Sequence, residues 1–295
     1  MTAYATAAID SGFTEHLMQL RAAVDGRLDE LLPAASNERD LVAAAIRDGA
    51  LAPGKRMRPL LLLLAADGLG ADQRPALDLA CAIEMVHAAS LILDDMPCMD
   101  NAQLRRGKPT VHLTFGEDIA ILAAVALLSR AFGVVASIDG LRPLVRTQLV
   151  EVLANTIGSQ GLVKGQLQDL RDGKHARTEE EIAATNNLKT GVLFGAIMDM
   201  AYLLSDAPKP VRGVLQRFAV ELGHAVQLFD DLQDINPNSD KDQGKDDGKS
   251  TLLALCGEQK VRERLDGHLA RAQICLDEAY RGDVYIGRFL RMLFG

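Results

Sequence analysis

The chain has 295 residues, and 48% of them are hydrophobic, which is enough to bury a large core. Its formal net charge of −8 argues against non-specific binding to nucleic acid and against docking on anionic lipid. We therefore expect neither kind of partner. The acidic balance leaves a phosphate ligand open, because a bound cation can invert the local charge.

Three features predict the cellular location. The four cysteines form no Cys-x-x-Cys pair, which is typical of thiols in a reducing compartment. The N-terminal stretch MTAYATAAIDSGFTEHL lacks a basic region followed by an apolar core, so we expect no signal peptide. The longest apolar run, 119–128, is too short to span a bilayer. The sequence thus predicts a cytoplasmic protein without a transmembrane segment.

The hydrophobic pattern is helical from the first segment onward. There, Leu17, Leu20, Val24, Leu28 and Leu31 recur at steps of three and four, which places them on one helix face. The same criterion predicts helices at 39–49, 57–68, 75–94, 117–137, 142–172, 179–204, 209–234 and 258–280. Alternating apolar and polar runs flanked by turn residues are missing, so strands are not expected.

Turn signals at 32–33, 52–54, 107–109, 139–140 and 207–210 separate these helices. Several of the helices are apolar around most of their circumference, which places them inside a large bundle. The chain contains no linker, no low-complexity tract and no repeat of solenoid period. We expect a single all-α domain over residues 1–295.

The segment LILDDMPCMDNAQLRRG, at 91–107, places three carboxylates at the end of an apolar helix and two arginines just beyond. The carboxylates belong to Asp94, Asp95 and Asp100, and the arginines are Arg105 and Arg106. On an ideal helix Asp100 would point away from the other two. Pro97 cannot donate to the carbonyl four residues back, so it disrupts the helix, and we expect the break to turn Asp100 towards the pair.

A second carboxylate cluster ends the segment 209–234. Asp230, Asp231 and Asp234 project within about 100° of one another on one helix face, where they repel unless a cation lies between them. Hard oxygen ligands of this kind suit Mg²⁺, which often shares itself with substrate phosphates. Either cluster alone could be an exposed polar helix end, but the presence of two favours a diphosphate head on a hydrocarbon tail.

Seven motifs together carry a family resemblance over nearly the whole chain. They are GKRMRP at 54–59, DDMPCMD at 94–100, LRRG at 104–107, GQLQD at 165–169, LKTG at 188–191, QLFDDLQD at 227–234 and KDDGKST at 245–251. With this ordered set the chain resembles the trans-isoprenyl (polyprenyl) diphosphate synthases, and most closely the bacterial geranylgeranyl diphosphate synthases of carotenoid pathways. The resemblance implies the isoprenoid synthase fold, a helical bundle around a central apolar cavity.

The resemblance also implies the roles of individual residues. Asp94, Asp95, Asp100, Asp230, Asp231 and Asp234 would form a Mg²⁺ system, with three ions per site, that holds the allylic diphosphate. Arg105, Lys189, Thr190, Gln227 and Lys249 would contact the same diphosphate. Lys55, Arg58, His87 and Arg106 would bind isopentenyl diphosphate, and Gln166 and Asp169 would form a polar pair on the cavity wall. A homodimer is expected from the family.

The implied reaction elongates an allylic diphosphate (dimethylallyl, geranyl or farnesyl) with isopentenyl diphosphate. We expect geranylgeranyl diphosphate, C20, as the product, with a farnesyl diphosphate (C15) synthase as the alternative. The tail would run down the helix that ends at Asp94, where Ala89 and Ser90 would face it about 5–7 Å below the metals. A terpene cyclase would not need two diphosphate sites, and a non-catalytic partner subunit would typically lack an aspartate cluster.

Two further patterns have plainer interpretations. GKDDGKS, at 244–250, has three residues between its glycines where a P-loop has four, and no strand precedes it, so we reject an NTPase. Whether Lys241 or Lys245 closes the site is left open. His87 by itself would be a core histidine, and the other histidines, His112 included, lack metal spacing and are interpreted as structural or surface residues.

Overall fold

The computed structural model describes residues 11–172, 175–234, 252–280, 282 and 284–295. Its first helices are α1 (Ser11–Leu31), α2 (Leu41–Ala50), α3 (Met57–Gly68), α4 (Gln73–Asp94), α5 (Val111–Phe115), α6 (Glu117–Ala136) and α7 (Pro143–Ile157). They are followed by α8 (Leu162–Asp172), α9 (Glu179–Asn186), the π-helix η1 (Asn187–Gly191), α10 (Val192–Leu203), α11 (Lys209–Asp234), α12 (Leu252–Cys256), α13 (Glu258–Ala279) and α14 (Tyr285–Phe294). The all-α prediction is confirmed.

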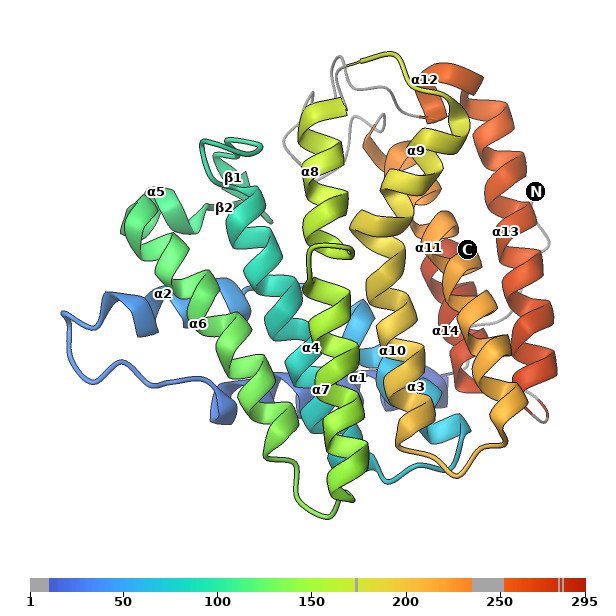
Figure 1. The fold of residues 1–295 in the computed structure, drawn as a ribbon, viewed down its shortest axis with the longest axis horizontal. Coiled ribbons are helices and arrows are strands. Elements are labelled where there is room, and N and C mark those ends of the chain that lie inside the picture. Colours follow the sequence, from blue (N-terminus) through green and yellow to red (C-terminus); the bar gives the residue numbers. More distant parts are fainter. Residues whose placement is uncertain (1–10, 173–174, 235–251, 281, 283) are drawn as a thin grey trace.

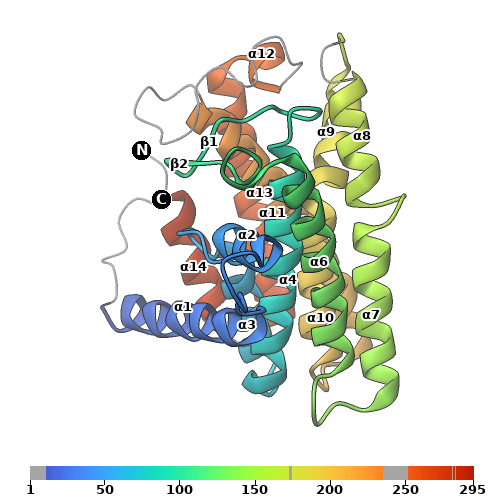
Figure 2. The same cartoon turned by 90° about the vertical axis from the view of Figure 1, so that its left-hand side faces the viewer.

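The long helices α4, α6, α7, α10, α11 and α13 run side by side, and α1 lies across one face of the bundle, against α3 and α4 (Figures 1 and 2). Helices α4 and α11 both finish at the upper end of the bundle in Figure 1. The strands β1 (Leu104–Arg105) and β2 (Lys108–Pro109) lie at that end too, as do α8, α9 and α12. The ends of the two predicted carboxylate helices therefore share one end of the molecule.

The core explains why α3 and α4 lack a polar face. Every residue from Leu60 to Ala66 of α3 is at most 4% exposed, and so is every residue from Leu79 to Val86 of α4. A helix buried on all sides reads as apolar around its circumference. A second apolar cluster, made by Ile182, Ala225, Leu228, Leu232, Leu252, Val261, Leu265 and Leu269, packs α9, α12 and α13 around the end of α11.

Two predicted helices are interrupted in the structure. The segment 142–172 is split into α7 and α8 by a turn at 158–161, where a side chain on Gly161 would collide with the Thr156 carbonyl. The segment 179–204 contains the π-helix η1 between α9 and α10. Single-turn π-helices are frequent at functional sites. Helices α5 and α12 were not predicted, because each is too short to carry a full apolar repeat. The pattern of α14, which has ten residues like α2, was missed.

Strands were not expected, yet the structure contains one short antiparallel ladder. Leu104 pairs with Pro109 and Arg105 with Lys108. The intervening residues, Arg106 and Gly107, have φ of 53° and 77°, the pattern of a type I′ turn. A ladder of two residues on each side is too short to show alternation in the sequence.

Two of the described helices, α4 and α6, are long and apolar enough to cross a bilayer. The fold buries 67% of the most apolar stretch of α4 and 39% of that of α6. The core helices of soluble proteins can be equally long and apolar. The absence of a transmembrane segment and the cytoplasmic location stay predictions.

Glycines allow the backbone of η1 to be approached closely from both sides. A Cβ on Gly165 of α8 would lie 2.6 Å from the Leu188 carbonyl carbon and 2.8 Å from Lys189 Cα, and a Cβ on Gly223 of α11 would lie 2.9 Å from Gly191 Cα. These distances are below those of real Cβ contacts. The position of η1 therefore depends on the missing side chains of α8 and α11.

We predict that Gly165→Ala destabilises the protein by about 1–3 kcal/mol, because the added methyl group overpacks against backbone that cannot rotate away. Urea unfolding measures the change. The matched control is Gly213→Ala in α11, where nothing lies within 4 Å of an added Cβ. The control should gain up to about 1 kcal/mol of helix propensity. Equal stability of the two variants would show that η1 is not held in this way.

Candidate active site

The first carboxylate cluster is formed by a reversal of the backbone after α4. The Asp100 N–H donates to the Asp94 carbonyl at 2.9 Å, and the Asn101 N–H donates to the Met96 carbonyl at 3.0 Å. Asn101 has a positive φ of 48°, a conformation that asparagine tolerates better than most residues. The predicted break after Asp94 is confirmed, and it returns the backbone of Asp100 to the end of the helix.

Arg105 covers this cluster from β1. Its Nε donates to both carboxylate oxygens of Asp95, at 3.1 and 3.2 Å, and its Nη2 also bonds to Oδ1. The Asp95 side chain is 5% exposed. Burial lowers the pKa of Arg105, but the carboxylates of Asp95, Asp94 and Asp100 outweigh it and leave the pKa raised. The arginine therefore stays charged against the cluster.

Arg106, at the tip of the turn, reaches a different segment. Its Nη1 donates to the Pro53 carbonyl at 3.0 Å and to the Ala52 carbonyl at 3.4 Å. A side chain on Gly54 would collide with the guanidinium of Arg106. The hairpin thus joins the end of α4 to the loop before Lys55, which is an exposed residue.

Arg58, His87 and Phe194 form a second group below the hairpin. Nη1 of Arg58 lies 3.4 Å from Nε2 of His87, and its guanidinium carbon lies 5.3 Å from the centre of the Phe194 ring. Burial lowers the pKa of Arg58, and burial together with the charge of Arg58 lowers the pKa of His87 well below its ordinary value. In the described chain, the buried Nε of Arg58 has no hydrogen-bond acceptor.

A third group lies between α8, η1 and α11. Lys189 Nζ donates to Asp169 at 2.7 Å. Thr190 donates to Gln227 at 3.4 Å, and Gln227 donates to Asp231 at 2.9 Å. Gln166 and Asp169, expected as a polar pair, do not bond to each other. Asp169 instead accepts from Lys189, and the buried amide nitrogen of Gln166 has no partner in the part of the chain that the structure describes.

Electrostatic effects connect these groups. Burial, together with the negative charges of Asp100 and Asp95, raises the pKa of Asp94 to about 6 against the lowering effect of Lys189. Burial lowers the pKa of Lys189, but Asp169 and Asp94 outweigh it and leave the pKa raised. The ends of α4, the hairpin and η1 therefore surround one region.

Some predicted site residues are not brought together in this way. Lys249, Lys241 and Lys245 lie outside the described residues, and so does the side chain of Asp234. Within those residues, no three histidine, cysteine, aspartate or glutamate side chains lie close enough to hold a metal ion. The negative charge of Asp230 partly opposes the lowering of the pKa of Arg58 by burial. Asp230, from the second carboxylate cluster, therefore lies near the group formed by Arg58, His87 and Phe194.

The two residues predicted to face the hydrocarbon tail lie on α4. Ala89 is fully buried, and Ser90 is half-buried, with its hydroxyl donating to the His87 carbonyl at 2.8 Å. A small side chain at the first position is therefore enclosed by neighbours. Whether those neighbours border a central cavity stays a prediction.

Sequence reasoning missed two sets of residues at this site. Arg56 forms 2.7 Å ion pairs with Asp25 of α1 and Glu84 of α4. His112 bonds through Nδ1 to the Thr110 hydroxyl, at 3.0 Å, and that hydroxyl donates to the Ala102 carbonyl. Arg56 lies inside the GKRMRP motif, which could have indicated it. His112 lies outside the seven motifs, so none of them pointed to it.

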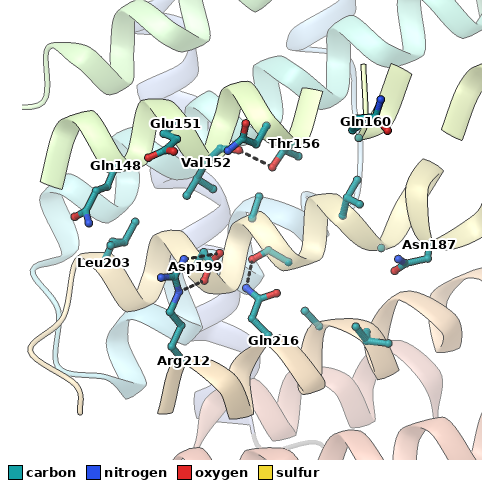
Figure 3. A pocket seen from close by; sticks show the side chains of 18 residues that line it. Gln148, Glu151, Val152, Thr156, Gln160, Asn187, Asp199, Leu203, Arg212 and Gln216 are labelled. Carbon is teal, nitrogen blue, oxygen red and sulfur yellow. Dashed lines mark hydrogen bonds and ion pairs between the residues drawn. The ribbon is translucent and has the colours of Figure 1, made fainter. Parts of the chain in front are cut away.

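The larger of the two described pockets lies on another face. It occupies about 560 Å³ between α7, α10 and α11, where Asp199 and Arg212 face each other (Figure 3). It borders Asn187 and Gly191 of η1. Lys189 is two residues from each, so it projects towards the other side of η1. The ion pairs, rather than this pocket, locate the candidate site.

Comparisons with known proteins agree with this geometry. The polyprenyl synthetase family model matches residues 39–278. The chain is 56% identical over 263 residues to a geranylgeranyl diphosphate synthase of Pantoea ananas, covering 88% of this chain and 87% of that protein. It is 46% identical over 278 residues to one of Pseudescherichia vulneris, covering 94% and 90%.

A solved structure matches over almost the whole chain. It is a geranyltransferase of Helicobacter pylori, complexed with magnesium and isoprenyl diphosphate, with a TM-score of 0.86, 25% identity, and coverage of 97% of this chain and 98% of that one. The fold is therefore the all-α isoprenoid synthase fold. From the family match and the two relatives together, the chain belongs to the polyprenyl synthetase family.

Proposed function

We propose that the protein is a geranylgeranyl diphosphate synthase, which condenses isopentenyl diphosphate with an allylic diphosphate. The observation that carries this proposal is the presence of two groups of cations along α4, one at its C-terminal end and one about two turns earlier. Lys189 and Arg105 lie near Asp94, whereas Arg58 lies beside His87. Two cationic groups fit two diphosphates, and both relatives named above are geranylgeranyl diphosphate synthases.

The donor chemistry of the aspartates fits Mg²⁺. Asp94, Asp95, Asp100, Asp230 and Asp231 offer hard oxygen ligands, and the pKa of Asp94 is raised to about 6 although Lys189 and Arg105 oppose the rise. Burial is the largest cause of the rise, so a bound cation would lower the free-energy cost of ionising this carboxylate. These residues would hold Mg²⁺, with Asp234, and we propose three ions per site. Bound Mg²⁺ supplies a Lewis acid that neutralises the charge developing on the allylic diphosphate.

The remaining chemistry belongs to side chains of this chain. Lys189, Thr190, Gln227, Arg105 and Lys249 would orient the allylic diphosphate, and Lys189 would stabilise negative charge as the C–O bond ionises. Lys55, Arg58, Arg106 and His87 would hold isopentenyl diphosphate so that its double bond faces the allylic carbon. Gln166 and Asp169 would form the polar part of the wall. His87, whose pKa is far below its ordinary value, would act as a neutral donor.

We propose C20 as the product because of the side chain at Ala89. It is enclosed on α4, the helix that ends in the first cluster. A methyl group leaves more room beside the helix than a ring does, which favours further elongation over release at C15. Ser90, which follows it, is half-buried.

We also propose a homodimer formed through α6. Ile121, Leu122 and Val125 of this helix are 46–58% exposed, and Leu113 of α5 and Leu144 of α7 are exposed as well. Exposed apolar side chains gathered on one face mark an interaction site. Sedimentation equilibrium measures the mass in solution, and a monomer at all concentrations would contradict this proposal.

One incubation tests the proposed function. The pure protein is incubated with labelled isopentenyl diphosphate, Mg²⁺ and each allylic primer in turn, and the chain length of the product is measured. We expect C20. C15 would indicate the alternative synthase, and a product formed without isopentenyl diphosphate would indicate a terpene cyclase. No turnover by the chain alone would indicate a non-catalytic partner subunit.

We predict that the pKa of Asp94 makes the metal-free protein pH-sensitive. The folded pKa is about 6 and the ordinary value is 3.8, so the fold holds this proton more tightly than the unfolded chain does. Its stabilising contribution is full below about pH 4 and is lost as pH rises through about 6. Asp94→Asn should therefore stabilise the protein in EDTA at about pH 7.5, by on the order of 1–3 kcal/mol, and change little at about pH 4.

Thermal unfolding with and without Mg²⁺ checks this. Mg²⁺ should raise the melting temperature of the wild type at neutral pH, and raise that of Asp94→Asn by less. A variant that is less stable than the wild type in EDTA at neutral pH would contradict the assignment.

We predict that the two cationic groups serve different substrates. Arg58→Ala should chiefly raise the KM for isopentenyl diphosphate, and Lys189→Ala should chiefly raise the KM for the allylic substrate. A charge-assisted hydrogen bond contributes about 1.5–3 kcal/mol, or about tenfold to a hundredfold in affinity. Arg212→Ala is the matched control, since it removes an exposed 2.8 Å ion pair with Asp199 on the other face. Equal shifts of both KM values in both site variants would show that the partition is wrong.

We predict that Ala89→Tyr shifts the main product from C20 to C15 while the first condensation survives. The ring would occupy space next to the growing tail, and overpacking such a site costs about 1–3 kcal/mol. Product chromatography measures the shift, and the melting temperature reports any loss of folding. Ala88→Tyr is the control, because that side chain projects about 100° away. If a folded, active Ala89→Tyr enzyme still makes C20, residue 89 does not limit the length of the hydrocarbon tail.

A further inference from the structure

Arg56 has an unusual backbone for its position. It directly precedes α3, between Lys55 and Arg58, with φ of 48° and ψ of 32°, which is the left-handed region. A side chain with a Cβ adopts this region only when the surrounding structure holds it there. The Arg56 carbonyl also accepts the first helical hydrogen bond of α3, from Leu60 at 3.1 Å. The conformation of Arg56 therefore determines where α3 begins and where Lys55 and Arg58 lie.

Two carboxylates hold the Arg56 side chain, which is 3% exposed. Its Nε donates to Asp25 of α1 at 2.7 Å, and its Nη1 donates to Glu84 of α4 at 2.7 Å. Burial lowers the pKa of Arg56, but Glu84 and Asp25 outweigh it and leave the pKa raised. The charged guanidinium, with one hydrogen bond to each carboxylate, is thus held between α1 and α4.

Glu84 is also central to the other arginines. It is a charged residue inside the fully buried run 79–86 of α4, and its side chain is 5% exposed. Its charge raises the pKa of both Arg58 and Arg106 against the effect of burial. In the described chain its ion pair is with Arg56 alone. Because Arg56 already pairs with the Glu84 carboxylate, the N–H groups of Arg58 can donate to a bound anion.

We propose that Arg56, held by Glu84 and Asp25, is a positioning residue for the isopentenyl diphosphate site: it fixes the left-handed turn that presents Lys55 and Arg58 without touching the substrate itself. This inference rests on the proposed function. It assigns a role to three residues, two of which lie outside the motifs of the site. The effect of losing Arg56 should therefore fall on one substrate.

A plainer role for Arg56 would be to tie α1 to α4. The chain offers a matched control for that role. Arg27 of α1 forms a 2.7 Å ion pair with Asp78 of α4, so it joins the same two helices with the same kind of bond. Asp78 lies six residues before Glu84 and near the other end of the buried run. A purely structural tie should make both pairs equivalent.

The experiment measures both KM values, kcat and the melting temperature for the wild type and three variants. In the double variant Arg56→Met/Glu84→Gln, no buried charge is left unpaired, so the fold should survive. Asp25→Asn is the milder second variant, since Asp25 is 43% exposed. Asp78→Asn is the control.

We expect the double variant to raise the KM for isopentenyl diphosphate by about tenfold or more, the loss that follows when one charge-assisted contact is misplaced. The allylic KM should change by less than about twofold. Asp25→Asn should show a smaller shift of the same kind. Asp78→Asn should lower the melting temperature with both KM values unchanged.

Three outcomes would overturn the proposal. They are an unchanged KM for isopentenyl diphosphate in the double variant and in Asp25→Asn, equal shifts of both KM values, or the same shift in Asp78→Asn. The wild type in the same assay separates this failure from that of the proposed function. Absence of isopentenyl diphosphate consumption by the wild type sinks the function, whereas normal wild-type kinetics with any of the three outcomes sinks only the role of Arg56.

Discussion

Helix α4 and the residue after it hold two buried carboxylates, and the site depends on how their negative charges are compensated. Glu84 is 3% exposed and Asp95 is 4% exposed, and an unpaired carboxylate at such depth costs several kcal/mol by typical estimates of about 3–5. The compensating cations come from other elements, Arg56 before α3 and Arg105 on β1. Each ion pair also fixes where its own element lies against α4. Neutralising the helix and assembling the site are therefore one requirement.

The positions of Lys189 and Thr190 depend on close packing rather than on charge. Lys189 and Thr190 lie on η1, where the wider π-helical turn changes the direction of each side chain relative to α9 and α10. Gly165 and Gly223 allow α8 and α11 to touch the η1 backbone. Because both contacts need a hydrogen atom in place of a side chain, the orientation of Lys189 follows from residues on two other helices.

The sequence predicted what local patterns carry. The buried helices α3 and α4 followed from continuous apolar runs, and the aspartates stood out because carboxylates seldom end such runs. The break at 158–161 was missed although Gly158 and Gly161 mark it locally, and the π-helix did not follow because it depends on contacts between helices that no local pattern contains. Arg56 was missed for the same reason. Its carboxylate partners lie 31 and 28 residues away, so its role is visible only once α1 and α4 are packed.

The hairpin tip has a consequence for how the two halves of the site communicate. Arg105 is bonded to Asp95, just after α4, and the next residue, Arg106, is bonded to the carbonyls of Ala52 and Pro53, just before Lys55. Two consecutive residues of the hairpin thus contact the end of α4 and the loop before Lys55, so a shift of one of these segments acts on the other through the hairpin. A ligand that moves either segment changes the free energy of filling the other site by way of the hairpin, and thermodynamic linkage makes that coupling equal in both directions.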